Sequence, residues 1–374
     1  MRKVLFLIHD LGQGGAEKVL VNLVNNMDRS KFDISVTALF GGGVNEQFLA
    51  PDVHFHAVFP KEVPGNSKLM KLLTPKQLHK LCVTEHYDIE VSYLEGPSAR
   101  VISGCQDPNT RLVCWIHSTI EGIQDAARSF RSNREAEQCY GSFHSIVGVS
   151  ENVMQAFKRV FPDVTAYVLH NTLDTSQIIR QGQEMIPVSS MRSYEINLIA
   201  VGSMKPVKGF DRLLRIHSRL RGEGYPIHLY LLGKGPDLES LKRQADTLCH
   251  DGTVTFLGYD TNPYKYITKA DMFICCSYSE GFSTAATEAL IVGTPVCTVE
   301  VSGMKEMLGE HDEWGIVTEN NEEALYQGIK DLLDHPDKLA HYKEKAVERG
   351  KTFNTENTVR AVEEMLLKLI HKGK

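Results

Sequence analysis

Short apolar runs alternate with helix-length segments along almost the whole chain, and this alternation limits the possible folds more than any other feature. Strands separated by helices form βαβ units, which build parallel sheets. The sequence therefore predicts an α/β protein built on parallel sheets, with one architecture used twice along the chain. The expected strands are 4–8, 34–39, 54–58, 89–93, 112–116, 145–149 and 167–169 in the first half, and 196–201, 227–232, 254–257, 272–276, 295–299 and 315–317 in the second.

The length of the chain also favours two domains, because 374 residues exceed what one hydrophobic core comfortably holds. The apolar periodicity fades between residues 171 and 193, where the sequence is polar and contains Pro187. We therefore predict a first domain over 1–170, a linker over 171–193, a second domain over 194–355, and a final helix and tail over 356–374.

Composition narrows the class of protein. The net charge of −6 gives no reason to expect nucleic acid as a partner, and no apolar run reaches the roughly 18 residues of a membrane span. The N-terminal apolar run at 4–8 is too short for a signal peptide, so we expect a cytoplasmic protein. No C-x-x-C pair occurs, so the cysteines are expected to be small buried residues in a reducing compartment rather than disulfide partners or a zinc site; they are Cys82, Cys105, Cys114, Cys139, Cys249, Cys275, Cys276 and Cys297.

One stretch, 279–290, joins an expected strand to a helix through a tight glycine turn. Ser283 or Thr284 can cap the helix. A helix N-terminus presents free N–H groups and partial positive charge, so it is a natural seat for a phosphate. Glu280 and Glu288 flank that seat. On spacing alone they could equally be a first-turn acid and a solvated helix residue.

The string E-G-F-S…E-A-L…G-T-P-V in this region closely resembles the E-x7-E signature of glycosyltransferase family 4. Members are retaining, nucleotide-sugar-dependent enzymes with two facing Rossmann-like domains, the GT-B architecture, and their C-terminal helix typically returns to the first domain. The resemblance implies that Glu280 holds sugar hydroxyls near the reacting carbon and that Glu288 holds the ribose. It also implies that the donor diphosphate lies on the backbone of Gly281, Phe282, Ser283 and Thr284.

The second domain contains other turns that resemble the family. After the strand 196–201 comes G-S-M-K-P-V-K-G, in which Lys208 would stabilise the departing diphosphate. The arginine usual in the family is replaced by Ser203; Lys205 is a candidate substitute or a solvated lysine. The resemblance places Gly233 in a G-x-G-P turn and Leu257 near the nucleotide base. Uridine rather than guanosine is inferred only from its frequency in the family.

Three stretches of the first domain are also candidates. Gly14 and Gly15 follow the first strand, but Glu17 stands where a dinucleotide fingerprint needs glycine, and the second strand lacks the acidic residue of NAD sites. The loop resembles instead the family's first loop, which borders the donor. His117, after another strand, would by resemblance bond the donor sugar, or be structural. Glu95 could line the acceptor cleft or be an ordinary loop acid.

A segment of the first domain, residues 68–81, combines lysines with leucine and methionine. A basic amphipathic helix can rest on an anionic membrane surface. A helix that packs on the core and turns its lysines to solvent explains the same pattern. The lysines concerned are Lys68, Lys71, Lys76 and Lys80.

We therefore predict a retaining glycosyltransferase that moves a hexose-type sugar from a UDP-sugar to a carbohydrate or lipid-linked saccharide, in cell-surface polysaccharide synthesis. Glu280, Lys208 and His117 are the expected catalytic residues. No D-x-D motif is present, so neither a metal nor another cofactor is expected. The alternatives are an epimerase or phosphorylase with this fold, or a two-lobed sugar-binding protein without catalysis.

Overall fold

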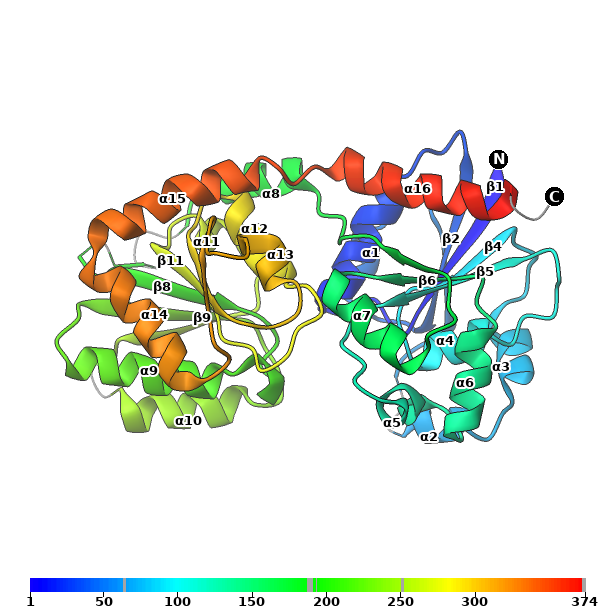
Figure 1. The fold of residues 1–374 in the computed structure, drawn as a ribbon, viewed down its shortest axis with the longest axis horizontal. Helices are drawn as coiled ribbons and strands as arrows, with labels where there is room; N and C mark the ends of the chain where they lie inside the picture. The colour runs from blue at the N-terminus through cyan, green and yellow to red at the C-terminus, as the bar shows by residue number, and fades with distance from the viewer. Residues whose placement is uncertain (63–64, 187–190, 193, 250–251, 372–374) are drawn as a thin grey trace. The chain divides into compact units, whose positions relative to one another are not determined.

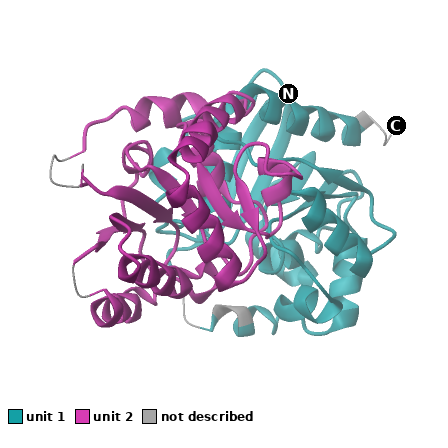
Figure 2. Cartoon of the chain, turned by 60° about the vertical axis from the view of Figure 1, so that its left-hand side comes forward, with its two compact units in different colours: residues 1–173, 355–374 teal, residues 174–354 magenta. Residues whose placement is uncertain are grey.

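The computed structural model describes residues 1–62, 65–186, 191–192, 194–249 and 252–371. The chain forms two compact units, coloured separately in Figure 2: unit 1 is Met1–Leu173 with Thr355–Lys374, and unit 2 is Asp174–Asn354. Residues 187–190 and 193 of the expected linker lie outside the described part. The beginning of that linker forms helix α8 (Thr175–Gly182), which belongs to unit 2.

Unit 1 is built on a seven-stranded parallel sheet with the order β3-β2-β1-β4-β5-β6-β7 (Figure 1). Each strand overlaps a run that the sequence predicted. The strands are β1 (Arg2–Ile8), β2 (Phe32–Phe40), β3 (His54–Phe59), β4 (Ile89–Ser92), β5 (Arg111–Ile116), β6 (Ser145–Gly148) and β7 (Ala166–Val168). The helices are α1 (Gly15–Asn26), α2 (Asn66–Met70), α3 (Pro75–Cys82), α4 (Pro97–Ile102), α5 (Ile123–Ala126), α6 (Asn133–Gly141) and α7 (Glu151–Val160), with short 3-10 turns at Glu46–Phe48 and Ala127–Ser129.

Unit 2 repeats this architecture with a six-stranded parallel sheet in the order β10-β9-β8-β11-β12-β13. The strands are β8 (Ile196–Val201), β9 (Ile227–Leu232), β10 (Val254–Gly258), β11 (Met272–Cys275), β12 (Val296–Val299) and β13 (Ile316–Thr318). Besides α8, its helices are η3 (Pro206–Lys208), α9 (Phe210–Gly222), α10 (Leu238–Leu248), α11 (Tyr264–Ile267), α12 (Thr284–Ile291), α13 (Met304–Leu308), α14 (Glu322–Asp334) and α15 (Pro336–Gly350). Two sheets of this kind confirm the predicted fold class.

The central strands of each sheet are largely apolar because helices cover both faces of the sheet, whereas the edge strand β3 (HFHAVF) is mostly exposed. In β1 the residues from Val4 to Ile8 are at most 1% exposed. In unit 2, Leu198 and Met272 of the central strands pack in one cluster with Leu213 of α9 and Ile329 of α14. Burial on both faces explains why continuous apolar runs, rather than alternating ones, marked the strands in the sequence.

The last helix, α16 (Thr355–His371), belongs to unit 1 and contacts α1 (Figure 1). It buries the apolar positions expected from the sequence: Val359, Val362, Met365, Leu366 and Leu369. Glu363 accepts a hydrogen bond of 2.6 Å from the backbone N–H of Asp28. Of the helices in the described part of the chain, none is long and apolar enough to cross a membrane.

Each sheet has one point where the strand order reverses direction. It lies between β1 and β4 in unit 1 and between β8 and β11 in unit 2. In open α/β sheets, ligands bind outside the carboxyl ends of the strands at such a point. Within each unit, the loops after these two strands are therefore where ligand binding is expected, and such loops hold most of the residues selected from the sequence.

Candidate active site

The reversal point of unit 2 brings together Lys208, after β8, and Glu280, after β11. The Lys208 Nζ lies 2.6 Å from Glu280 Oε1, and the hydroxyl of Ser277 donates to the same oxygen at 2.6 Å. Burial lowers the pKa of Lys208 and the facing Glu280 carboxylate raises it; the carboxylate prevails, so this pKa lies above its ordinary value. A fixed positive charge thus stands at the end of the sheet, beside a carboxylate that holds it.

The turn that carries Lys208 is pressed against the end of β11. Gly209 has a φ of +67°, and a Cβ there would lie 1.9 Å from the carbonyl oxygen of Cys276. Only glycine fits, because both the backbone conformation and the contact exclude a side chain. Buried Arg212 of α9 also holds the end of β11 in place, because its guanidinium donates to the carbonyls of Cys276 and Ser277 at 2.8 Å each.

The N-terminus of α12 follows Glu280 directly. Ser283, one of the two predicted capping residues, is the N-cap, and its hydroxyl accepts from the backbone N–H of Ala286 at 3.3 Å. Thr284 is the first helical residue. Gly281 and Phe282 form the preceding turn, where the Phe282 ring packs against Gly303, the N-cap of α13. The positive end of the α12 dipole therefore lies next to the Lys208–Glu280 pair.

Glu288 lies on the inner side of α12. It is 4% exposed, and the hydroxyl of Tyr264 donates to its carboxylate at 3.2 Å. The interpretation of Glu288 as a solvated helix residue is therefore wrong. A buried carboxylate that accepts from a tyrosine is held in one orientation, which suits a residue that must receive hydrogen bonds from a ligand.

The remaining candidates of unit 2 line the ends of β8, β9 and β10. A Cβ at Gly233 (φ +146°) would lie 1.9 Å from the carbonyl oxygen of Gly202, so these loops touch through their backbones. Ser203 is half-buried, whereas Lys205 is exposed. Leu257 is half-buried in β10, and just beyond it the Lys234 ammonium stands 4.6 Å from the Tyr259 ring centroid.

In unit 1, the loop after β1 begins with His9 and Asp10 and leads to Gly14, the N-cap of α1, and Gly15, its first residue. The Asp10 carboxylate accepts from the Gly12 N–H at 2.6 Å and pairs with His9 at 2.7 Å; its hydrogen bond raises the pKa of His9. A Cβ at Gly14 would lie 2.0 Å from Glu17 Oε2. The Glu17 carboxylate thus stands at the positive end of α1, where a dinucleotide-binding protein would hold a pyrophosphate.

Glu95, after β4, and His117, after β5, are brought together. One oxygen of Glu95 accepts from the His117 backbone N–H at 2.9 Å, and the other accepts from the Ser118 hydroxyl. Burial lowers the pKa of His117 to about 3, so its ring is neutral at neutral pH. Its Nε2 is buried with no hydrogen-bond partner among the described residues. A buried unpaired nitrogen is costly unless a ligand satisfies it.

Three residues at these loops escaped the sequence analysis: Arg212, Tyr264 and Ser277. Arg212 and Tyr264 occur in ordinary helical patterns, and nothing in the sequence indicates that their polar groups point inward. Ser277 follows the strand β11 and precedes Glu280 by three residues, so its closeness to the carboxylate could have been inferred from the turn. Each of the three fixes a candidate residue or the loop that carries it.

Comparison with known proteins identifies the family of the chain. The family model described as Glycosyltransferase Family 4 matches residues 13–177, and the model described as Glycosyl transferases group 1 matches residues 183–349. The two together span nearly the whole chain, with one model for most of each unit. The motifs of both halves therefore belong to a single kind of enzyme.

Similar proteins include a Campylobacter jejuni N-acetylgalactosamine-N,N'-diacetylbacillosaminyl-diphospho-undecaprenol 4-alpha-N-acetylgalactosaminyltransferase, 28% identical over 95% of this chain and 96% of the relative. A Rhizobium meliloti lipopolysaccharide core biosynthesis glycosyltransferase is 24% identical over 98% and 97%. The fold resembles that of an Anabaena protein solved in complex with UDP-glucose, with a TM-score of 0.76, 18% identity, and coverage of 98% of this chain and 100% of that one. The chain belongs to the family 4 glycosyltransferases, as its motifs predicted.

Proposed function

We propose that this protein is a retaining glycosyltransferase that takes a hexose-type sugar from a UDP-sugar and adds it to a saccharide carried on a lipid diphosphate, for a cell-surface polysaccharide. The observation that carries the proposal is the Lys208–Glu280 pair beside the N-terminus of α12, at the reversal point of unit 2. The Campylobacter relative, named for a diphospho-undecaprenol acceptor, and the UDP-glucose bound to the Anabaena protein support the two substrate classes.

In the proposed reaction the bond between the anomeric carbon and the donor diphosphate breaks, and a bond to the acceptor oxygen forms on the same face. The acceptor proton passes to the departing diphosphate oxygen. Lys208 and the N–H groups of Gly281, Phe282, Ser283 and Thr284 would stabilise the negative charge that grows there. No metal is needed for this role, because the ammonium and the helix dipole supply the positive charge.

Each remaining residue has a binding role in the proposal. Glu280 would exchange part of its contact with Lys208 for sugar hydroxyls, and Glu288 would accept from the ribose. The unpaired Nε2 of His117 would bond a sugar hydroxyl. Gly14, Gly15, Ser203, Lys205 and Gly233 would border the diphosphate, Leu257 would contact the base, and Glu95 would line the acceptor side.

The test is a panel of nucleotide-sugars mixed with lipid-diphosphate saccharides, read out as released nucleotide. We expect UDP to appear only when donor and acceptor are both present, with the same initial rate in EDTA as in added Mg²⁺ or Mn²⁺. An isomerised nucleotide-sugar formed without acceptor would indicate an epimerase, and release that needs inorganic phosphate would indicate a phosphorylase. A strict Mn²⁺ or Mg²⁺ requirement would contradict the proposed place of the diphosphate.

The acceptor class also implies contact with a membrane, for which unit 1 has a suitable segment. Leu69 and Leu72 are 58% and 75% exposed, and Lys68, Lys76 and Lys80 are exposed as well. In α3 the apolar Leu78 and Cys82 are buried, so this helix also packs on the core. The exposed leucines and lysines thus suit contact with a membrane, and the buried residues of α3 suit packing on the core.

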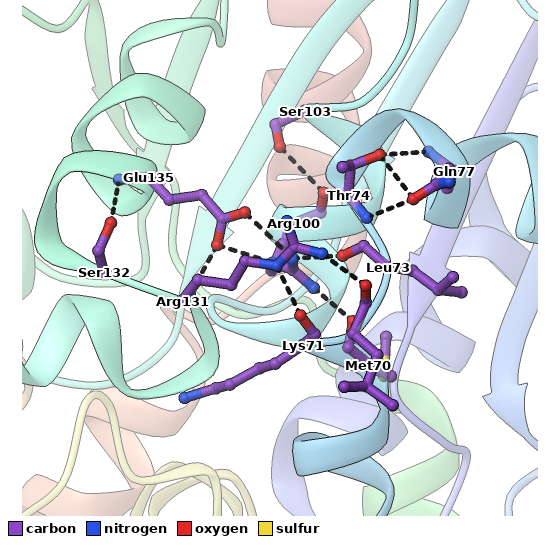
Figure 3. A network of polar contacts seen from close by, with 11 residues as sticks. Met70, Lys71, Leu73, Thr74, Gln77, Arg100, Ser103, Arg131, Ser132 and Glu135 are labelled. Carbon is purple, nitrogen blue, oxygen red and sulfur yellow. Dashed lines mark hydrogen bonds and ion pairs between the residues drawn. The ribbon is translucent and has the colours of Figure 1, made fainter.

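Two arginines hold this segment in place (Figure 3). The buried Arg100 guanidinium donates to the carbonyls of Met70 and Leu73 at 2.8 and 2.6 Å and pairs with Glu135. Arg131 donates to the carbonyls of Lys71 and Leu72. The backbone between α2 and α3 is therefore fixed while Leu69 and Leu72 face outward. A fixed apolar tip surrounded by lysines suits an anionic lipid surface, and we propose that it rests on the cytoplasmic face of the membrane.

Replacement of Lys68, Lys76 and Lys80 by glutamine should weaken binding to anionic vesicles about a hundredfold, since each lysine near such a surface contributes about 1 kcal/mol. The matched control replaces Lys269, Lys343 and Lys351, which are exposed lysines of unit 2, and should bind nearly as the parent does. Co-sedimentation with vesicles measures the difference. Equal losses in both variants, or no binding by the parent, would refute the membrane contact.

A further inference from the structure

Three side chains with metal-binding atoms meet in unit 1, away from the candidate active site: His79 of α3, Glu90 of β4 and Cys105, which follows α4. One ligand atom from each lies within 4.8 Å of the other two. His79 Nε2 is 2.7 Å from Glu90 Oε2, and Cys105 Sγ is 3.7 Å from Glu90 Oε1. Glu90 is the second residue of β4, whereas the active-site loops follow the carboxyl ends of the strands.

The cluster is buried on one side and reachable on the other. The Glu90 side chain is 3% exposed and that of His79 is 15% exposed. A carboxylate as buried as this one requires a positive partner, because an isolated charge is not tolerated in the interior. Cys105 and the exposed edge of His79 leave a route by which an ion and a water molecule could enter.

The backbone holds the three elements close together. A Cβ at Gly104 would lie 2.0 Å from the carbonyl oxygen of Pro75, the first residue of α3. The turn after α4 is thus pressed against the start of α3, and this contact brings Cys105 to His79. Among the described residues, no other group of histidine, cysteine and carboxylate side chains meets in this way.

We propose that His79, Glu90 and Cys105 bind a zinc ion. An imidazole, a thiolate and a carboxylate are zinc ligands, and an open fourth position would take water. In a tetrahedral zinc site the Zn–N and Zn–O bonds are about 2.0–2.1 Å long and the Zn–S bond is about 2.3 Å long. The nitrogen and oxygen ligands then lie about 3.3 Å apart, and the sulfur lies about 3.6 Å from the oxygen. The Cys105 Sγ–Glu90 Oε1 distance of 3.7 Å is close to this value, and the His79 Nε2–Glu90 Oε2 contact of 2.7 Å must open by about half an ångström. Because the two contacts use different oxygens of Glu90, the carboxylate must also turn so that one oxygen faces the ion.

Zinc binding at this cluster would also leave the buried site without net charge. Zinc would replace the proton between His79 and Glu90 and the thiol proton of Cys105, and both protons would pass to solvent. A divalent ion with one carboxylate and one thiolate is neutral overall. The ion would join α3, β4 and the turn after α4. No sequence motif indicated such a site, since its ligands are 11 and 15 residues apart and lack a C-x-x-C spacing.

The test is titration of tag-free, metal-stripped protein with Zn²⁺ and with Co²⁺. We expect one Zn²⁺ per chain, and a thiolate-to-cobalt charge-transfer band with Co²⁺. At a hundredfold excess over the dissociation constant, Zn²⁺ should raise the melting temperature by about 5 °C or more. Cys105→Ser keeps a hydrogen bond to Glu90 but removes the thiolate, so Zn²⁺ affinity should fall more than about tenfold and the band should vanish.

The matched control is Cys249→Ser, which replaces another partly exposed cysteine, in unit 2, and should leave the stoichiometry and the cobalt band unchanged. His79→Gln should lose Zn²⁺ while circular dichroism shows it folded. An unchanged Zn²⁺ affinity in Cys105→Ser, a parent protein without the thiolate–cobalt band, or no saturable binding would each overturn the proposal. None of these measurements depends on glycosyl transfer.

Discussion

Replacing Lys208 by alanine should lower kcat by about a hundredfold or more and change the donor KM much less. The ammonium faces charge that grows as the nucleotide departs, and loss of one such electrostatic donor costs about 2.7–4 kcal/mol of transition-state stabilisation.

In contrast, Glu288→Ala should mainly raise the donor KM, because a residue that holds the ribose binds the ground and transition states alike. Steady-state kinetics with the donor identified by the nucleotide-release panel measures both effects.

The Lys208 result needs two controls, because the lysine also pairs with Glu280. Circular dichroism and the melting temperature must show that the variant is folded, since the change leaves a half-buried carboxylate without its cation. Lys269→Ala removes an exposed lysine of the same unit and should leave kcat unchanged. Normal turnover in a folded Lys208→Ala variant would remove the chemistry from this site.

Replacing Gly209 by alanine should strongly destabilise unit 2. Its φ of +67° is unfavourable for any residue with a Cβ, and that Cβ would collide with the Cys276 carbonyl at 1.9 Å. Backbone strain alone costs about 1–3 kcal/mol, and relief of the collision must move the turn that carries Lys208. We expect unit 2 to lose more than about 3 kcal/mol, so its melting temperature should fall by roughly 6 °C or more.

Gly224 offers a matched control for the strain. It also has a positive φ, +95°, but a Cβ there meets nothing within 4 Å. Gly224→Ala should therefore cost about 1 kcal/mol, or roughly 2–4 °C, with normal activity. Differential scanning calorimetry of the two variants separates strain from collision. Equal shifts would show that the contact with Cys276 has no energetic importance.

The helix N-terminus at Ser283 could be predicted from the sequence because its determinants are local. A buried strand, a glycine turn and a capping serine occupy consecutive positions, so no distant part of the chain is needed to recognise them. The strands were predictable for a related reason. Burial between helices makes most of them apolar runs, bounded by the polar and glycine residues of their loops.

The partners of the candidate residues could not be predicted in the same way. Glu288 has the spacing of a surface acid, and only the packing of α11 against α12 brings Tyr264 to it. Similarly, both oxygens of Glu95 are engaged by the loop after β5. Hydrogen bonds between separate strands and helices depend on how the elements pack, and a residue's own neighbours in sequence carry no record of that packing.

By itself, the sequence determined the α/β class, the order of strands and helices, and the turns that mark a family 4 glycosyltransferase, since all of these depend on short-range patterns. Only the tertiary structure decided that Lys208 pairs with Glu280, that the Nε2 of His117 is buried and unpaired, and that His79, Glu90 and Cys105 meet. The last of these depends on the contact between the turn after α4 and the start of α3, and the parallel sheet is the physical reason for the others. It places the ends of strands that are far apart in sequence side by side, and the resulting proximity fixes the charges and hydrogen bonds of the site.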